Sequence, residues 1–357
     1  MKIKKIDALS NKCESCGNNL IFNPEMQALF CPACKISKSI DTSDNYLKHD
    51  FDVNAPAIDA NEEWKNQDKA MKCPNCGASV VLQGYEISST CPYCDTSLIS
   101  TGDKNAKIKP DGIIPFAIGP QKATELFINR IKKSKLAPNS FRKKVTADSI
   151  HSYYFPAFIY NAECNTNYSG MLYNEHTVRD SKGFTQTKRR YFRIEGTIRT
   201  LHKNIEIEAS EKIGQLELLA VKPYNFDKAK QFSNDYLSGY CAECYSSSVK
   251  NTFNAANTVI KSSIRTSILK KYSYDGVSNL DMNINYLTKN YSYFMLPMYR
   301  VNFNFKNKKY SNIINGQTGK VGGKVPKSKW KISLIVIASI LAFLIPIILT
   351  ILLNTGV

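Results

Sequence analysis

The sequence predicts an α+β protein with two small N-terminal zinc ribbons, a mixed α/β core and one C-terminal transmembrane helix. Three observations predict this organisation: cysteines form two quartets of equal spacing, strand-like and helix-like segments follow one another in mixed order, and the chain closes on a long apolar run. Aromatic residues are plentiful, with 20 Tyr and 17 Phe among 357 residues, and favour a core with substantial sheet.

Eight of the 11 cysteines form two quartets with the spacing C-x2-C-x14-C-x2-C. The first quartet is Cys13, Cys16, Cys31 and Cys34, and the second is Cys73, Cys76, Cys91 and Cys94. Adding 60 to each number of the first set gives the second, which indicates an internal duplication. Four thiolates suit a tetrahedral Zn²⁺ ion and leave no position open for substrate, so we expect two structural zinc ions. Gly17 and Gly77 follow the second cysteines and accept the positive φ that such a turn needs.

Two other cysteine chemistries are disfavoured. Disulfides require an oxidising compartment, and the start of the chain lacks the apolar region of a secretory signal. A redox C-x-x-C site is one pair on a βαβ frame, whereas this chain has four pairs in duplicate. Cys241 and Cys244 stand alone in a stretch expected to be helical and are interpreted as packing residues, and Cys164 has no partner by spacing.

The sequence predicts seven segments. They are a zinc ribbon over 1–40, an acidic linker over 41–70, a second ribbon over 71–100, a linker over 101–112, the α+β core over 113–318, a basic neck over 319–331 and the transmembrane helix over 332–353. A short helix is expected around Trp64. Within the core we expect helices over 123–133, 227–245 and 252–272, and strands over 153–160 (interrupted by Pro156), 191–200, 204–208, 291–305 and 309–314. A turn at 306–308 joins the last two strands.

The apolar run over 332–353 has 22 residues without a charge and would span about 33 Å as a helix. Five lysines precede it, and no charged side chain follows it. These are Lys320, Lys324, Lys327, Lys329 and Lys331. Positive residues stay on the cytoplasmic side, so the sequence predicts a single-pass protein of the cell membrane with a C-terminal anchor and a cytoplasmic body. The same lysines are expected to contact anionic lipid headgroups, while the ribbons are expected to be freer to reach a partner.

The net charge and the sequence motifs limit the classes of function that the chain can have. The formal net charge is +18, and two Zn²⁺ ions on eight thiolates would reduce it to about +14. A basic chain meets nucleic acid or anionic membranes. Residues 315–320 fail the Walker pattern, because only two residues separate Gly316 from Gly319 and no Ser or Thr follows Lys320. We therefore expect a turn at the end of the last strand there, no nucleotide hydrolysis and no enzyme.

Six short motifs follow the ribbons. They are GIIPF at 112–116, YYFPA at 153–157, KPYNF at 222–226, DYLSGY at 235–240, LPM at 296–298 and NGQTGK at 315–320. With the ribbons, they resemble the YdjG-type zinc-ribbon membrane proteins of Firmicutes, which carry the labels primosomal-helicase-like (primosomal protein N′-like) or TFIIB-type zinc-ribbon protein. The helicase label follows from cysteine spacing, since the motor motifs are missing here. The resemblance implies an association with phage-shock-type envelope-stress proteins and supplies no active site.

The leading hypothesis is a membrane-anchored zinc-ribbon adaptor that recruits a cytoplasmic protein partner, in an envelope-stress response of the phage-shock type. The alternative is a nucleic-acid-binding zinc-ribbon protein tethered to the membrane. The ribbons lack the dense basic and aromatic stripe that nucleic-acid binding favours. Basic runs in the core, such as Lys188, Arg189 and Arg190, are interpreted as solvated surface.

Overall fold

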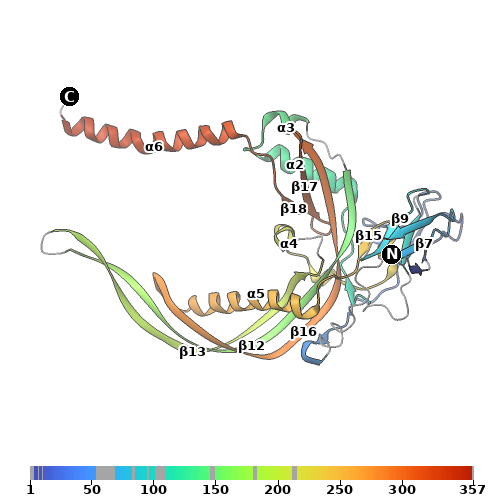
Figure 1. Cartoon of the computed structure of the whole chain (residues 1–357), viewed down its shortest axis with the longest axis horizontal. Coiled ribbons are helices and arrows are strands. Elements are labelled where there is room, and N and C mark those ends of the chain that lie inside the picture. Colours follow the sequence, from blue (N-terminus) through green and yellow to red (C-terminus); the bar gives the residue numbers. More distant parts are fainter. Residues whose placement is uncertain are drawn as a thin grey trace. The chain divides into compact units, whose positions relative to one another are not determined.

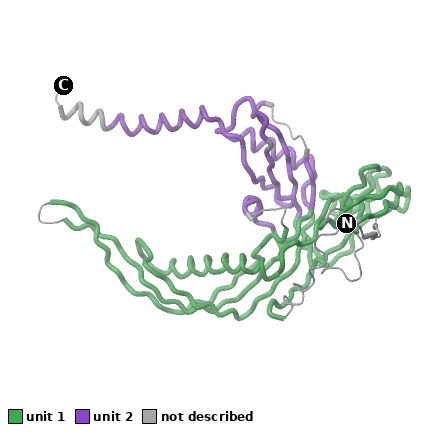
Figure 2. Tube along the Cα trace, viewed as in Figure 1, with its two compact units in different colours: residues 1–115, 154–215, 225–296 green, residues 116–153, 216–224, 297–357 purple. Residues whose placement is uncertain are grey.

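The computed structural model describes the chain except residues 1–3, 7, 10, 54–68, 83–84, 95, 101–108, 145–148, 180–182, 211–214 and 356–357. The chain forms two compact units, shown in different colours in Figure 2. Unit 1 comprises 1–115, 154–215 and 225–296, and unit 2 comprises 116–153, 216–224 and 297–357. Helices and strands are mixed in both units, so the predicted α+β class is confirmed.

The main sheet of unit 1 has the strand order β14-β11-β16-β12-β15-β9-β10-β2, with β13 paired to β12 and β6 paired to β16. The strands of unit 1 are β1 (Lys4–Ile6), β2 (Ala8–Leu9), β3 (Ile21–Asn23), β4 (Ala28–Phe30), β5 (Ser37–Ser39), β6 (His49–Asp50), β7 (Lys69–Lys72), β8 (Ser79–Leu82), β9 (Glu86–Thr90), β10 (Ser97–Ser100), β11 (Gly112–Ile113), β13 (Thr185–Glu208), β14 (Lys230–Gln231) and β15 (Cys241–Glu243). Strands β12 (Ser149–Arg179) and β16 (Gly276–Phe305) contribute residues to both units.

Helix α5 (Val249–Leu269) covers one face of the long strands β12, β13 and β16 (Figure 1). It begins at Ser248, whose hydroxyl accepts the amide of Asn251 at 3.1 Å and caps the helix. Its buried side chains recur every three or four residues and meet alternate residues of the strands. This cluster comprises Ile260, Ile264 and Ile268 of the helix with Ala162, Cys164, Tyr168, Leu172 and Ile194 of the strands.

Unit 2 is built around the end of β16, β17 (Lys308–Asn315) and β18 (Val321–Gly323). Its helices are α2 (Pro120–Lys133), α3 (Asn139–Lys144), most of α4 (Gln215–Val221) and α6 (Lys329–Thr355). Pro120 starts α2 at the position where its missing N–H costs nothing, and buried residues recur every fourth position. Phe127 of α2 and Phe141 of α3 pack on Phe303, with ring centroids 5.2 and 5.3 Å away.

Several sequence predictions are confirmed by these elements. Helix α2 matches 123–133, and α5 matches 252–272 apart from its first and last turns. Strands β16 and β17 pair antiparallel, and Lys306 and Asn307 form the turn with φ of 48° and 58°, as a tight hairpin requires. The helix expected around Trp64 lies outside the described residues.

Other predictions are wrong. Residues 227–245 form two short 3-10 helices, η2 (Phe226–Lys228) and η3 (Asn234–Leu237), and strands β14 and β15, not an α-helix. The strands predicted over 153–160, 191–200 and 204–208 are confirmed as strands, but their predicted ends and the interruption at Pro156 are wrong, since they are parts of the continuous strands β12 and β13. Strand β17 is not the last, because the turn over 315–320 leads into β18; Gly319 takes the positive φ there, at 74°.

The described parts of the two predicted linkers, 41–53 and 109–112, lie against the main sheet. Strand β6 pairs with Asn290 and Tyr291 of β16. His49 Nε2 lies 2.7 Å from one carboxylate oxygen of Asp111, and the other oxygen accepts the amide of Tyr293 at 2.8 Å. Burial raises the pKa of Asp111, although the Tyr293 amide and His49 oppose this change.

Candidate metal centres

The structure brings the eight predicted cysteines together as two separate groups of four sulfurs, each group within 4.8 Å. In the first centre, Cys13 Sγ lies 3.5 Å from Cys34 Sγ, and Cys16 Sγ lies 3.5 Å from Cys31 Sγ. In the second, the equivalent distances are 3.6 Å for Cys73 to Cys94 and 3.7 Å for Cys76 to Cys91. A tetrahedron with metal–sulfur bonds of about 2.3 Å has sulfurs about 3.8 Å apart, so both groups fit a tetrahedral metal ion. All eight cysteines are free of disulfides.

Tight turns place the sulfurs. The amide of Gly17 donates to the carbonyl of Cys13 at 2.9 Å, and the amide of Gly77 donates to Cys73 at 2.9 Å. These two glycines have φ of 72° and 77°, as predicted from the sequence. Lys35 occupies the same position after Cys34, with φ of 67° and an amide donated to Cys31 at 2.9 Å. A lysine therefore adopts a backbone conformation that favours glycine.

The two centres also repeat each other in strand register, as a duplication requires. Strand β4 pairs with β5 through Phe30↔Ser37, Leu29↔Lys38 and Ala28↔Ser39. Strand β9 pairs with β10 through Thr90↔Ser97, Ser89↔Leu98 and Ser88↔Ile99, the same partners shifted by 60. In both centres the first and third cysteines are buried and the second is exposed. We call β3–β5 with Cys13–Cys34 the first ribbon, and β7–β10 with Cys73–Cys94 the second ribbon.

The electrostatics of both centres suit a cation. The amide of Cys34 lowers the pKa of Cys31 to about 6, and the hydroxyl of Thr96 lowers the pKa of Cys94 to about 6. The amide of Ile36 lowers the pKa of Cys34, but the neighbouring sulfurs raise it more, to about 12. The same opposition, with the amide of Ala78, raises the pKa of Cys76 to about 12. Without a metal, Cys34 and Cys76 therefore resist ionisation. A bound divalent ion favours the thiolate form and would lower the pKa of both thiols.

The first ribbon is docked on residues 233–245. The amide of Phe22 donates to the carbonyl of Ser238 at 2.9 Å, and the Phe22 ring lies 5.2 Å from that of Tyr236. Asn11 Nδ2 donates to the carboxylate of Asp235 at 2.9 Å. Gly239 leaves room for Ile21, because an added Cβ would lie 3.2 Å from it. The prediction that the ribbons are freer to reach a partner is therefore wrong for the first ribbon.

The second ribbon is part of the main sheet. Strand β9 pairs with β15, and β10 pairs with β2, while β7 pairs with β1 and β8 in a separate three-stranded sheet. The two ribbons also meet directly. Asn19 Nδ2 donates to the hydroxyl of Thr96 at 2.8 Å, and Thr96 Oγ1 lies 3.1 Å from Cys94 Sγ. The second ribbon is therefore also fixed in place.

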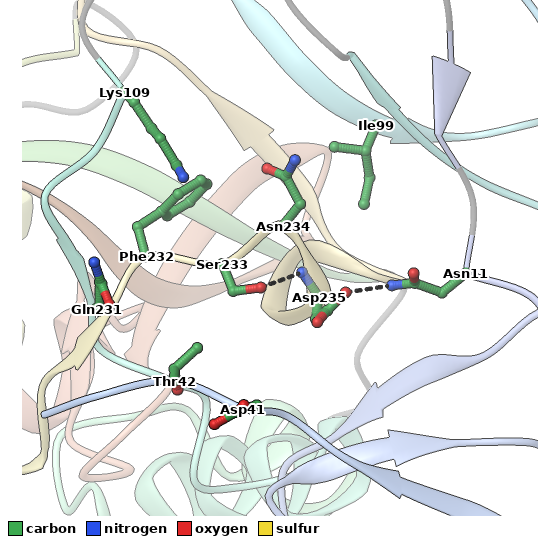
Figure 3. A pocket seen from close by; sticks show the side chains of 10 residues that line it. All are labelled: Asn11, Asp41, Thr42, Ile99, Lys109, Gln231, Phe232, Ser233, Asn234 and Asp235. Carbon is green, nitrogen blue, oxygen red and sulfur yellow. Dashed lines mark hydrogen bonds between the residues drawn. The ribbon is translucent and has the colours of Figure 1, made fainter.

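A polar cleft of about 460 Å³ lies beside the ribbons (Figure 3). Asn11 lines it from the side of the first ribbon and Ile99 from the second, and Asp41, Thr42, Lys109 and residues 231–235 complete the lining. Lys109 Nζ lies over the ring of Phe232, 5.9 Å from its centroid. The cleft thus offers one ammonium, two carboxylates and several amides to a ligand.

The chain is 31% identical over 330 residues to the Bacillus subtilis (strain 168) protein described as "Uncharacterized protein YdjG". The match covers 91% of this chain and 92% of that protein. The chain belongs to the YdjG family. No family model and no solved structure matches it, so the metal centres of this YdjG family member rest on the geometry above.

Two of the motifs that resemble those of YdjG-type proteins make structural contacts in this chain. Residues 235–240 hold the first ribbon through Asp235 and Ser238. Within unit 2, Asn315 Nδ2 donates to the carbonyl of Val221 at 3.1 Å, and Lys320 Nζ donates to the carbonyl of Lys222. The Asn315 side chain also accepts the amides of Gln317 and Thr318, at 2.8 and 2.9 Å. The motif over 315–320 therefore closes a hairpin and fastens it to residues 221–223.

The five predicted membrane-contact lysines are placed differently from one another. Lys331 Nζ donates to the carbonyls of Ala137 and Lys135 at 2.8 and 3.1 Å and to Asn139 Oδ1 at 2.9 Å. Lys320 is bound to Lys222 as described, whereas Lys324, Lys327 and Lys329 are exposed. The ammonium groups of Lys320 and Lys331 thus donate to protein oxygens.

The remaining cysteines form no third centre among the described residues, where only the two quartets bring three or more His, Cys, Asp or Glu side chains within ligating reach. Cys241 and Cys244 lie in and just after strand β15, so the helix expected there is wrong. Cys164 is buried beneath α5, and burial raises its pKa to about 11. It packs as a small apolar side chain.

Helix α6 is long and apolar enough to cross a membrane. None of the residues in its 18-residue window Lys329–Pro346 is buried within the protein. A soluble core helix would bury such a window, so the apolar surface of α6 needs a different apolar environment.

Proposed function

We propose that this protein is a membrane-anchored adaptor whose two zinc ribbons form a fixed head that recruits a cytoplasmic partner to the cell membrane. The observation that carries this proposal is the closure of both metal centres by four sulfurs in a chain that also bears the uncovered helix α6. Four sulfur ligands leave no position for water or substrate, which favours structural Zn²⁺ over a catalytic metal.

The head offers a surface suited to a protein. Exposed apolar side chains stand out on both ribbons: Met26 is 50% exposed, Ile36 is 47% exposed and Tyr93 is 75% exposed. Met and Tyr are enriched at the centres of protein interfaces. The polar cleft beside the ribbons adds charges of both signs, which suit a polar segment of the same partner. Because both ribbons are docked, the partner meets a preformed surface and little ordering cost opposes binding.

Helix α6 supplies the anchor in this proposal. The basic neck precedes it, and the positive-inside rule therefore favours a cytoplasmic head. Protease added to intact spheroplasts should leave the head uncut. Cleavage of the head under these conditions would refute the orientation.

Proximity labelling tests the recruitment. A biotin ligase fused to the N-terminus of the full chain should label a reproducible protein set, and phage-shock-type membrane-stress proteins are the first candidates. Substitution of Met26, Ile36 and Tyr93 by Ala should remove the partner from that set. Leu201→Ala, which removes a side chain 62% exposed on β13, is the matched control. If the control also loses this labelling, or if the triple variant keeps it, the proposal that Met26, Ile36 and Tyr93 bind the partner is wrong.

A further inference from the structure

The long sheet of unit 1 has two faces, and only one of them carries α5. Leu172 of β12 and Phe192 of β13 pack in the cluster beneath α5. Side chains alternate between the faces of a strand, so His176, Lys188 and Arg190 project on the same side as α5. We call this side, together with the exposed surface of α5, the α5 face.

Three arginines on the opposite face have carboxylate partners. Arg199 Nε lies 2.5 Å from the carboxylate of Glu163, and Arg193 lies 2.9 Å from Glu195. Arg189 Nε lies 2.9 Å from the carboxylate of Glu175 and covers the ring of Tyr173. Each of these arginines therefore has a carboxylate on its own face, and that face is close to neutral.

The α5 face lacks this compensation. Helix α5 contains no Asp or Glu but holds Lys261 and Arg265, and Lys270 and Lys271 follow it. Lys261 and Arg265 lie one and two turns beyond Asn257, which accepts the Tyr286 hydroxyl at 2.6 Å, so they occupy the flank of α5 over β16. Within the described chain, no ion pair joins Lys188, Arg190, Lys261 or Arg265 to a carboxylate. This face is therefore strongly positive.

The hairpin of β12 and β13 extends this face. The amide of Asp275, just before β16 begins, donates to the carbonyl of Tyr173 at 3.0 Å. Beyond that point, β12 and β13 continue as a two-stranded hairpin. Phe184, immediately before β13 in this hairpin, is 68% exposed. An aromatic side chain beside lysines and arginines is typical of a surface that enters the headgroup region of a bilayer.

We propose that the α5 face and the hairpin end bind the anionic headgroups of a lipid bilayer, as a second membrane contact besides α6. The ligand chemistry is lipid phosphate, and each basic side chain near such a surface adds electrostatic attraction to it. The exposed Phe184 and the presence of α6 in the same chain favour lipid over nucleic acid. The inference rests on the proposed membrane attachment and adds a site to it.

A single tryptophan at the hairpin end tests this contact in the full chain. Both native tryptophans, Trp64 and Trp330, are replaced by Phe, and Phe184→Trp supplies the reporter. The protein is reconstituted in vesicles of phosphatidylcholine, with or without phosphatidylglycerol. With phosphatidylglycerol, the emission should shift to shorter wavelength and brominated lipids should quench it several-fold more than in phosphatidylcholine alone. High salt should reverse both effects.

Two variants locate the contact. Lys188→Gln, Arg190→Gln, Lys261→Gln and Arg265→Gln together should abolish the quenching. Arg193→Gln with Arg199→Gln, on the opposite face, is the matched control and should keep it, and both variants should retain the metal content of the parent. Equal quenching with and without phosphatidylglycerol, equal loss in the control, or an emission shift caused by an oligonucleotide but not by phosphatidylglycerol would overturn the proposal.

Extraction with alkaline carbonate separates this proposal from the anchor. If the protein stays with the vesicles after carbonate extraction but brominated lipids do not quench the tryptophan at position 184, lipid binding by the α5 face is refuted. The anchor role of α6 is then retained. A protein that carbonate removes, yet phosphatidylglycerol vesicles quench at neutral pH, contradicts the anchor and supports the α5 face.

Discussion

The carboxamide of Asn19, in the first ribbon, donates to the hydroxyl of Thr96, in the second, at 2.8 Å. Because Thr96 Oγ1 accepts this bond, its own proton is available to Cys94 Sγ, 3.1 Å away. A side chain of one ribbon thus orients a donor to a metal ligand of the other. Such contacts around the ligands tune the basicity of the ligand and its hold on the metal.

The first prediction concerns Cys94 in the metal-free protein. Its pKa of about 6 lies below the ordinary 9.0, so the ionised form stabilises the fold above pH 9.0 and this contribution is lost as pH falls through about 6. At pH 7, Cys94 should react with iodoacetamide before Cys76, whose pKa is about 12, although Cys76 is exposed. Thr96→Val removes the main donor and should slow Cys94 several-fold, with Thr90→Val as control. Peptide mass spectrometry measures both rates; faster alkylation of Cys76 would contradict the assignment.

The second prediction compares the two metal centres. The purified full chain should contain two zinc ions, and Ser at Cys73 and Cys76, or at Cys13 and Cys16, should lower this to one. Because β9 and β10 belong to the main sheet, loss of the second centre should expose the amides of β9 and β15 to hydrogen exchange. Loss of the first should expose mainly β3–β5. Metal analysis below one ion per chain in the anaerobically purified parent would refute the assignment.

The third prediction uses the positive φ of Lys35. A side chain in this conformation costs about 1 kcal/mol relative to glycine, so Lys35→Gly should tighten metal retention about fivefold against a chelator. Gly17→Ala, at the equivalent turn of the same centre, should weaken retention by a similar factor. Lys38→Gly controls for the loss of a positive charge near the first centre. A Lys35→Gly protein that loses metal faster than the parent would show that the ammonium itself matters.

The fourth prediction concerns Lys331. Its ammonium binds oxygens of Lys135, Ala137 and Asn139, so it fastens the start of α6 to the segment between α2 and α3. Lys331→Gln should destabilise this junction by about 1–3 kcal/mol and raise hydrogen exchange over 134–144. Lys329→Gln, which changes an exposed lysine two residues earlier, is the matched control. Equal exchange in both variants would show that Lys331 contributes no more than charge.

The metal ligands could be predicted from the sequence because their geometry is local. Two residues separate the cysteines of each pair, and a residue with a positive φ follows the second cysteine at Gly17, Lys35 and Gly77, where the turn fixes both sulfurs. The docking of the first ribbon could not be predicted in this way. It depends on contacts such as Phe22 with Ser238, between residues more than 200 positions apart, for which the spacing of neither segment gives a signal.

The wrong helix over 227–245 has a specific cause. Tyr236 and Tyr240 are four residues apart and both pack on Phe22, with ring centroids 5.2 and 6.2 Å away. The helix-like spacing of these tyrosines therefore arises from the 3-10 helix η3 and the turn after it, which bring both rings to Phe22. Strands β12 and β13 are longer than the sequence predicts, because their uncovered face carries Asn, Glu, Lys and Arg residues, several of which have low strand propensity.

The different attachment of the two ribbons has a consequence for how such chains can evolve. The first copy sits on the surface of its neighbours, whereas the second supplies strands on which the register of the main sheet depends. A deletion of the outer copy would leave a shorter but complete scaffold, while a deletion of the inner copy would leave β15 without β9. We therefore expect homologous chains with a single ribbon to have kept the inner copy, and the outer one to vary in sequence, in metal or in presence as partners change.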